Sequence, residues 1–299
     1  MSPTARRIVL ALLAWSLILA SCGPTVPPDA IGPPDPVPTP PDVSPTVVPV
    51  PRTPPAAERT PVPYAERPSP TPPAATPSPP PVVIRRIPQS LVGTEWITLP
   101  TDERVVALTF DAGANADAVL AIMATLAAGE IPATFFLTGR WVENHPTYTR
   151  EIGRRYPVGN HSDTHPPFTG LSDAEMRAEI DRAESLIVEH SGRDPMPWFR
   201  FPYGDRDART IRVVNDLGYG SVRWTVDTLG WKGTSGGMSE DAVVERVLAE
   251  LRPGAIVLLH VGSHPTDRST LDADTLPRLI RELRARGYGF VDLDDFLDR

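Results

Sequence analysis

Short apolar runs alternate with longer amphipathic or alanine-rich stretches from about residue 82 to the end of the chain. The apolar runs predict buried strands, and the stretches between them predict helices. The predicted strands span residues 105–110, 133–137, 157–160, 198–201, 220–226, 255–260 and 288–293. The predicted helices span residues 115–128, 147–155, 172–190, 207–217, 241–251 and 274–286. Strands separated by helices indicate a parallel sheet, and for about 200 residues we expect barrel-like closure rather than an open doubly wound sheet.

Local signals mark the ends of several predicted helices. Ser172 and Glu175 form a capping box at the start of the longest one, because each side chain can bond the backbone N–H of the other residue. Gly129, Gly192 and Gly218 stand where helices should stop.

The first residues have the pattern of an export signal. Arg6 and Arg7 precede an apolar run from residue 8 to residue 20, which is short for a membrane span. The run ends in Leu19-Ala20-Ser21-Cys22, which resembles a bacterial lipobox. That resemblance implies a lipoprotein signal peptide of residues 1–21 and a lipid on Cys22, and the alternative is an ordinary secretory peptide. We therefore expect an exported lipoprotein of the cell envelope, anchored on the extracytoplasmic side of a membrane and not spanning it.

Proline dominates the segment that follows. Of the 38 prolines, 25 lie between residues 24 and 88, with Thr, Ser, Val and Ala between them. Proline fixes φ and removes backbone donors, so residues 22–88 are predicted to be a disordered, semi-rigid spacer after the lipidated cysteine. The other interpretation is a proline-motif ligand for a partner domain. The folded domain is expected over residues 89–299.

Charge and composition exclude several classes of function. The net charge is −8, Lys232 is the one lysine, and no basic cluster is present, so we expect no nucleic-acid partner. The sequence has no glycine-rich motif of the kind that binds nucleotides. Cys22 is the one cysteine, which leaves no internal disulfide. We expect the protein to be a monomer.

Residues with catalytic chemistry are concentrated where predicted strands end. His161 and His165 are four residues apart, so both imidazoles can bind one cation if the turn is helical, and imidazole suits Zn, Cu, Fe, Co or Ni. A pair of turn or capping residues is the competing interpretation. In barrels of parallel strands the active site lies at the carboxyl ends of the strands. Other polar residues at or near such ends are Asp111, Arg200, Asp227 and His260.

Five motifs occur in an order and spacing that resemble one family. They are Thr109-Phe110-Asp111-Ala112-Gly113, His161-Ser162-Asp163-Thr164-His165, Arg200-Phe201-Pro202-Tyr203-Gly204, Asp227 with Trp231, and Leu258-Leu259-His260. From about residue 100 to residue 299 the chain is similar to the polysaccharide deacetylases of the NodB-homology type, carbohydrate esterase family 4. The resemblance implies a distorted (β/α) barrel of about seven parallel strands, a divalent metal, and hydrolysis of acetyl groups on a sugar polymer. Zn is the expected metal, with Co, Ni or Mn as alternatives.

The resemblance also implies catalytic roles. Asp111 matches the general base of the family, and Arg200 matches the residue that pairs with this base. His260 matches the general acid, and Asp227 matches its orienting partner. Taken singly, Arg200 and Asp227 can also be interpreted as ordinary members of ion pairs.

Further matches concern the metal and the substrate. His161 and His165 match the metal ligands of the family. The backbone N–H of Tyr203 would bind the oxyanion, and Trp231 and Leu258 would wall the pocket that takes the acetyl methyl group. Taken singly, Tyr203 is also typical of a turn, and Trp231 and Leu258 are typical of a core.

Ala112 departs from the family pattern. In the family the residue after the base is usually a second aspartate that completes an Asp-His-His metal site, and catalytic metal sites ordinarily keep three protein ligands. We therefore expect either weaker metal binding or a substitute ligand. The candidates for that substitute are Asn115, Asp117, Asp163 and Asp111 itself.

The expected function is metal-dependent removal of acetyl groups from an amino-sugar polymer. N-acetylglucosamine or N-acetylmuramic acid units of peptidoglycan are the nearest substrate at the end of such a spacer. One alternative is a non-catalytic, carbohydrate-binding pseudoenzyme of the cell wall, which the loss of a ligand at Ala112 favours. The other is an esterase that removes O-acetyl groups from xylan or an exopolysaccharide.

Overall fold

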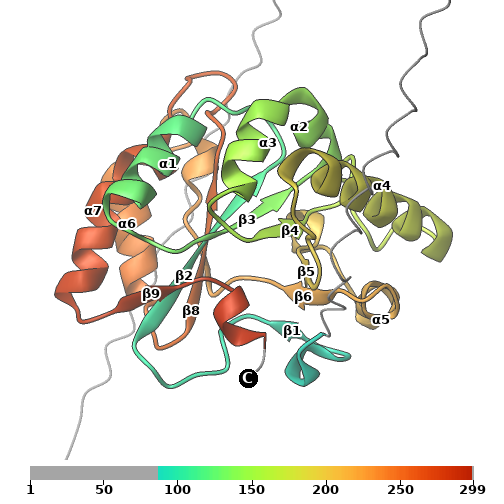
Figure 1. Cartoon of the computed structure of the whole chain (residues 1–299). Helices are drawn as coiled ribbons and strands as arrows, with labels where there is room; N and C mark the ends of the chain where they lie inside the picture. The colour runs from blue at the N-terminus through green and yellow to red at the C-terminus, as the bar shows by residue number, and fades with distance from the viewer. Residues whose placement is uncertain (1–86, 298–299) are drawn as a thin grey trace, which may run out of the picture. The chain divides into compact units, whose positions relative to one another are not determined.

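The sheet is built around its longest strand, β2 (Val105–Ala112) (Figure 1). The computed structural model describes residues 87–297. Strand β8 (Ala255–His260) pairs with one edge of β2. On the other edge, β3 (Thr134–Leu137) pairs with the second half of β2 and β9 (Gly289–Val291) with its first half. The remaining strands are β1 (Glu95–Trp96), β4 (Val158–Asn160), β5 (Trp198–Phe199), β6 (Gly220–Val222) and β7 (Val226–Asp227).

The strands follow the order β1-β6-β5-β4-β3-β2-β8-β7, and every pairing between these named strands is parallel. The ends of this order approach each other. The Thr225 hydroxyl, just before β7, donates to the Ile97 carbonyl beyond β1 and accepts the Ile256 N–H of β8. The sheet is therefore a curled half-barrel, which confirms the prediction of a distorted (β/α) barrel.

Helices surround the curled sheet in two groups (Figure 1). In the first group, α7 packs against both α1 and α6, and in the second, α4 packs against α2, α3 and α5. The α-helices are α1 (Val119–Ala128), α2 (Gly139–Asn144), α3 (Pro146–Gly153), α4 (Asp173–Ser191), α5 (Ala208–Asp216), α6 (Glu240–Ala249) and α7 (Leu271–Ala285). Short 3₁₀ turns are η1 (Gln89–Leu91), η2 (Pro202–Gly204), η3 (Gly230–Lys232) and η4 (Asp294–Phe296). Between residues 87 and 297 no helix has both the length and the apolar character needed to cross a membrane.

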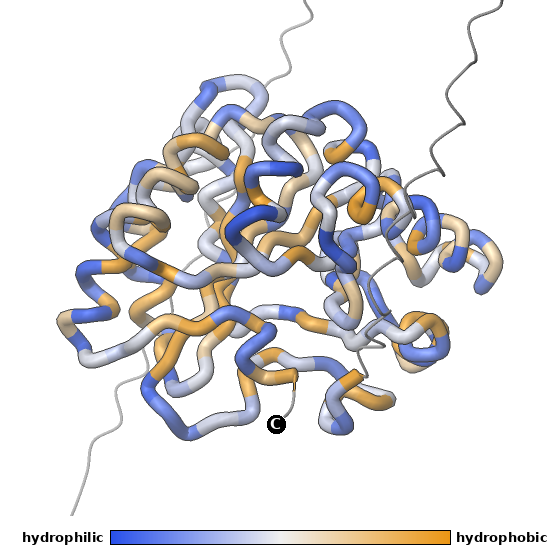
Figure 2. The backbone as a smooth tube through the Cα atoms, viewed as in Figure 1, coloured by the Kyte–Doolittle hydropathy of each residue, from blue (hydrophilic) through white to orange (hydrophobic). Residues whose placement is uncertain are grey.

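Alternation along β2 separates the core from the site. Val106, Leu108 and Phe110 belong to the apolar cluster that includes the inner faces of α1 and α7, because successive strand side chains point to opposite faces. Ala107 joins a second apolar cluster that includes Trp96, Trp198, Ile256 and Phe296. Figure 2 shows the apolar character of the central strands against the more polar outer helices.

On the same face of β2 as Ala107, polar side chains replace apolar ones toward the carboxyl end. Thr109 and Asp111 are both buried there. The interior of the half-barrel is therefore apolar along most of the strands and polar at their carboxyl ends. The sequence predicted the active site at these ends.

Helix α4 fixes the loop that carries the histidine pair. Its predicted capping box is present, with Ser172 and Glu175 each accepting a bond from the other's backbone N–H. Farther along the helix, the Glu179 carboxylate accepts the backbone N–H groups of Asp163 and Thr164 at 3.0 and 2.7 Å. Helix α4 therefore fixes the loop of residues 161–165 through the Glu179 carboxylate.

The predicted elements all occur between residues 87 and 297, with three differences. The strand predicted at residues 220–226 is split into β6 and β7, and neither β1 nor α2 was predicted. Residues 161–165 do not form the helical turn that the histidine spacing suggested, because Ser162 and His165 have φ values of 67° and 65°. The predicted signal peptide, Cys22 and the proline-rich spacer lie outside the described residues.

Candidate active site

Arg200 is the buried centre of the polar cluster. It follows β5 and is 0 % exposed, and its Nη1 donates to Asp111 Oδ1 at 2.7 Å. Its other donors reach the Thr109 hydroxyl at 2.9 Å and the carbonyls of Val222 and Arg223 at 3.2 and 3.0 Å. Because a buried charge is costly unless it is paired and hydrogen-bonded, this arrangement holds the guanidinium in one position.

The flat face of the Arg200 guanidinium lies 4.1 Å from the centre of the Phe136 ring. Phe136 comes from β3, while the carbonyls that Arg200 contacts come from β6 and the residue after it. Arg200 thus joins the carboxyl ends of several strands around the head of Asp111.

Asp111 is an ionised carboxylate in this setting. Burial alone would raise its pKa, but the charges of Arg200, His161 and His260 and the hydrogen bond from Arg200 lower it below the ordinary value. Its second oxygen, Oδ2, lies 3.3 Å from His161 Nε2. A buried carboxylate with one oxygen bound to Arg200 and the other beside an imidazole is ready to accept a proton.

His161 and His165 meet despite the irregular loop. His161 Nδ1 lies 2.8 Å from the Arg200 carbonyl oxygen, which can only accept, so Nδ1 carries the proton and Nε2 of the neutral ring carries a lone pair. The two Nε2 atoms lie 3.2 Å apart. Burial lowers the pKa of both rings, that of His165 to about 4, so both are neutral at pH 7.

This pair fits two positions on a metal ion. Two nitrogen ligands of one tetrahedral cation lie about 3.3 Å apart when each metal–nitrogen distance is about 2.0–2.1 Å. However, no group of three or more His, Cys, Asp or Glu side chains between residues 87 and 297 is placed to hold a metal ion. The donor set therefore fits a cation only in part, with two of the usual three protein ligands.

The substitutes considered for the missing ligand are engaged elsewhere. The Asn115 side chain bonds both backbone groups of Ser263 at 2.8 and 2.9 Å. Asp117 accepts from Arg268 at 2.6 Å, and the Asp163 carboxylate lies against the start of α2 at Gly139. Asp111 is the one candidate that lies beside the histidines.

Ala112 itself is fully buried and belongs to the apolar cluster between β2 and the helices. A carboxylate at this position would enter a dry, apolar environment. No other acid among the described residues has taken its place.

His260 lies beside Asp111, since the two are register partners on β8 and β2. The nearest carboxylate to its Nδ1 is not the predicted partner, Asp227, but Asp272 of α7, whose Oδ2 lies 3.5 Å away. Asp227 instead accepts the Leu229 N–H at 2.8 Å and the Trp231 Nε1–H at 3.2 Å. The geometry therefore assigns to Asp272 the contact that the resemblance implied for Asp227.

The predicted substrate residues surround this centre. Leu258 is buried on the same face of β8 as His260, and Trp231 lies with its ring centre 6.4 Å from that of His260. On the other side, the Tyr203 ring centre lies 4.5 Å from that of His165. Trp231 and Tyr203 are 47 % and 69 % exposed, so two accessible aromatic side chains flank the polar centre.

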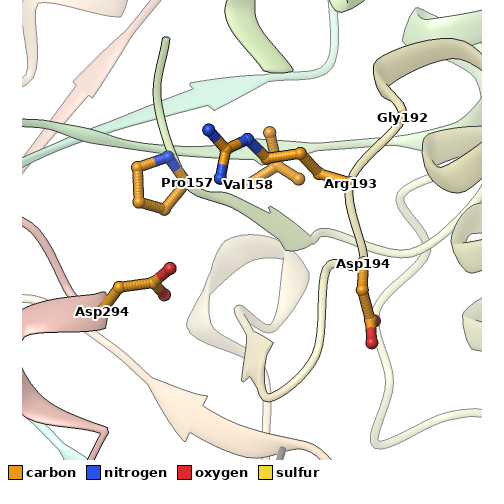
Figure 3. Close-up of a pocket in the computed structure, with 6 residues that line it drawn as sticks. All are labelled: Pro157, Val158, Gly192, Arg193, Asp194 and Asp294. Carbon is orange, nitrogen blue, oxygen red and sulfur yellow. The ribbon is translucent and has the colours of Figure 1, made fainter. Parts of the chain in front are cut away.

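A hollow of about 210 Å³ lies elsewhere in the fold, lined by Pro157, Val158, Gly192, Arg193, Asp194 and Asp294 (Figure 3). Pro157 and Val158 are at the amino end of β4, opposite to the end where Asp111 and the histidines lie. In Figure 3 the Asp294 carboxylate points into the hollow, whereas Asp194 points away from it. The side chains do not converge on a common point, so we place the active site at the carboxyl ends of the strands.

Known proteins are similar to this chain in sequence and in fold. A family model described as polysaccharide deacetylase matches residues 98–222. The peptidoglycan-N-acetylglucosamine deacetylase of Bacillus cereus is 31% identical over 195 residues, which cover 65% of this chain and 68% of that protein. The chain belongs to the polysaccharide deacetylase family. The resemblance read from the five motifs is thereby confirmed.

Two other members of the family are informative. The peptidoglycan-N-acetylglucosamine deacetylase PgdA of Listeria monocytogenes is 32% identical over 212 residues, or 71% of this chain, and the chain spans only 42% of its length. Among solved structures, a carbohydrate esterase family 4 pseudoenzyme from Bacillus anthracis is 28% identical, with a TM-score of 0.63 and a coverage of 70% of both chains. A mutant of that pseudoenzyme with restored enzymatic activity has the same TM-score. The polysaccharide deacetylase fold therefore occurs in proteins described as active and in one described as inactive.

Three residues of the site received no role from the sequence analysis. Asp272 stands in the first turn of a helix, where acids are common because of the helix dipole. Thr109 and Phe136 lie in runs of mostly apolar residues, a pattern that is typical of buried core strands. Their contacts with His260 and Arg200 depend on how distant strands come together.

We expect Arg200→Met to destabilise the fold by about 3–5 kcal/mol at pH 7, because removal of one partner leaves the other charge buried and unpaired. Chemical denaturation measures this loss. Because the pKa of Asp111 is lower in the folded state than in the unfolded state, the ionised carboxylate stabilises the fold. This stabilisation is fully present above the unfolded-state pKa and is lost as pH falls through the folded-state pKa. In the variant that pKa rises, so the difference from the wild type should shrink in acid.

Arg177→Met is the matched control, because the Arg177 side chain is partly exposed and lies 4.0 Å from the exposed Asp216. It should change stability little. A loss of stability in Arg200→Met that is small, or that does not depend on pH, would show that the ion pair with Asp111 does not organise the site.

Proposed function

We propose that the protein is a hydrolase that removes acetyl groups from amino sugars of a cell-wall polysaccharide. The observation that carries this proposal is the juxtaposition of Asp111 and His260 on neighbouring strands with pKa values shifted in opposite directions. The pKa of Asp111 lies below its ordinary value and that of His260 lies above it. An ionised base and a protonated acid therefore coexist over a broad range of pH.

In this proposal Asp111 takes a proton from a water molecule as the water oxygen attacks the acetyl carbon. The carbon–nitrogen bond then breaks, and His260 gives its proton to the departing amine, so that acetate and a free amino sugar are released. Arg200 keeps Asp111 ionised until it accepts this proton. Asp111 afterwards loses the proton to solvent and His260 regains one, which restores the starting state. Activity should rise as pH increases through the pKa of Asp111 and fall as pH increases through the pKa of His260.

His161 and His165 are the residues that would hold a divalent cation, for which Zn is our first choice and Co, Ni or Mn the alternatives. A cation at this position would polarise the acetyl carbonyl. Because only two protein ligands are available, we expect the cation to exchange readily. The backbone N–H of Tyr203 and the walls formed by Trp231 and Leu258 would receive the acetyl group.

Peptidoglycan is the substrate that we propose, at its N-acetylglucosamine or N-acetylmuramic acid units. The names of the relatives from Bacillus cereus and Listeria monocytogenes support this choice. A second candidate function is carbohydrate binding without catalysis. Ala112 and the similarity to a pseudoenzyme structure favour it, whereas the retained Asp111, Arg200 and His260 favour an enzyme.

Acetate release separates these functions. We expect purified protein with added Zn, Co, Ni or Mn to release acetate from peptidoglycan and from N-acetylglucosamine oligomers. Asp111→Asn should reduce the rate by roughly 10²- to 10⁴-fold, the contribution that general base catalysis makes. Release from acetylated xylan alone would indicate the esterase, and binding of peptidoglycan without any release would favour the pseudoenzyme.

The metal site has a separate test in Ala112→Asp. We expect this variant to retain more metal than the wild type after dialysis, because the added carboxylate would complete a three-ligand site. Without metal the variant should unfold at lower denaturant concentration than the wild type, since the carboxylate is buried beside Asp111. Added metal should reverse that loss.

Ala112→Asn is the control for shape, because it adds a side chain of the same size without the charge. Elemental analysis and denaturation in the presence of a chelator give both readouts. Equal metal content in the wild type and in Ala112→Asp would contradict a site that is limited by the ligand missing at residue 112.

We also propose that the protein is held at the extracytoplasmic side of a membrane by a lipid on Cys22. Cys22→Ser should move the protein from the membrane fraction to the soluble extracytoplasmic fraction, with no change in its rate of acetate release. Fractionation followed by immunodetection checks this. A variant that stays in the membrane fraction after a salt wash would contradict the lipid anchor.

A further inference from the structure

Asp272 is an acidic residue in an unusual position. It is the second residue of α7, where an acid normally interacts with the helix dipole from an exposed position. Asp272 is instead 3 % exposed. A buried carboxylate requires partners that compensate for lost hydration, and these partners indicate its role.

Its two oxygens join the ends of two strands. Oδ1 accepts the Thr228 hydroxyl at 2.6 Å, just beyond β7, and Oδ2 accepts the His260 backbone N–H at 2.8 Å, at the end of β8. The chain passes close to this carboxylate at Gly230, where a Cβ atom would overlap it. The fold therefore leaves space for Asp272 at a position fixed relative to His260.

The His260 ring has one buried nitrogen whose partner must be identified. Nδ1 is buried without a hydrogen bond of good geometry to any described residue, and Asp272 Oδ2 lies 3.5 Å from it. A lone pair on Nδ1 would face the carboxylate and be repelled, whereas a proton there would be attracted to it. This contact favours a proton on Nδ1 of the neutral ring, which leaves Nε2 for the substrate side.

We propose that Asp272 is the positioning residue of His260, which selects the Nδ1–H tautomer and keeps Nε2 available for proton transfer. The catalytic part of this inference rests on the proposed deacetylase function, but the tautomer does not. Asp227 is not placed for the same role in this geometry, because the carboxylate beside Nδ1 is that of Asp272, whereas Asp227 accepts from Leu229 and Trp231.

The surroundings of His260 agree with this assignment. Burial would lower its pKa, but the close contact and charge of Asp272, followed by the charges of Asp111 and Asp227, raise it above the ordinary value. These three carboxylates come from α7, β2 and β7, and the neutral imidazoles of His161 and His165 are also nearby. Asp272 is the carboxylate that also contacts the backbone of His260.

Nuclear magnetic resonance of the ring nitrogens tests the tautomer without any need for activity. In chelator-treated wild-type protein, we expect neutral His260 to be protonated at Nδ1 and its pKa to lie above the ordinary value. His260→Gln identifies the signals among the six histidines of the chain. A neutral ring protonated at Nε2 in the wild type would overturn the proposal, whether or not any variant folds.

Asp272→Asn removes the charge and keeps the shape. We expect the pKa of His260 to fall, the alkaline limb of the activity profile to move to lower pH, and kcat to drop roughly 10²- to 10⁴-fold with little change in KM. Asp274→Asn is the matched control, because Asp274 is exposed in the same helical turn and contacts the Thr270 hydroxyl. It should leave both profiles unchanged.

Asp227→Asn distinguishes the two acids. If it lowers the pKa of His260 more than Asp272→Asn does, Asp227 is the positioning residue and our assignment is wrong. If no variant or wild-type protein releases acetate while the tautomer and the pKa of His260 behave as expected, the proposed function fails and the role of Asp272 in holding the ring stands.

Discussion

The buried pair of Asp111 and Arg200 is the interaction on which the site depends. Asp111 ends the alternating pattern of β2, and Arg200 comes from beyond β5 to meet it at 2.7 Å. Because neither charge is stable alone in a buried position, each fixes the other and the strands that carry them. The carbonyl of Arg200 also fixes the tautomer of His161, so one residue organises the base and the histidine pair together.

Much of this arrangement could be predicted from the sequence, because its causes are local. Short apolar runs predicted the strands and amphipathic or alanine-rich stretches predicted the helices, and parallel strands bring their carboxyl ends to one edge. The spacing of Ser172 and Glu175 was enough to predict the start of α4. The motif resemblance then brought together residues far apart in the chain, such as Asp111 and His260.

Other features depend on tertiary contacts and were missed for that reason. The four-residue spacing of His161 and His165 suggested a helical turn, but Ser162 and His165 adopt left-handed backbone conformations that bonds to Asn160, Ser162 and Glu179 stabilise. Strand β1 has two residues, and it is a strand only because it pairs with β6, which is distant in the sequence. In the sequence Asp272 resembles any acidic residue in the first turn of a helix, because its contact with His260 forms only in the folded structure.

The absence of a second aspartate changes the electrostatics of the centre as well as its ligand count. Two carboxylates at residues 111 and 112 would repel each other unless a cation lay between them or one took up a proton. With Ala112 the charge of Asp111 is balanced by Arg200, and the lowered pKa values of His161 and His165 leave both rings neutral. The buried charges of this site are therefore balanced by its own residues. Folding depends on the ion pair of Asp111 and Arg200, whereas metal retention depends on the histidines and on the residue at position 112, so the two requirements rest on different side chains.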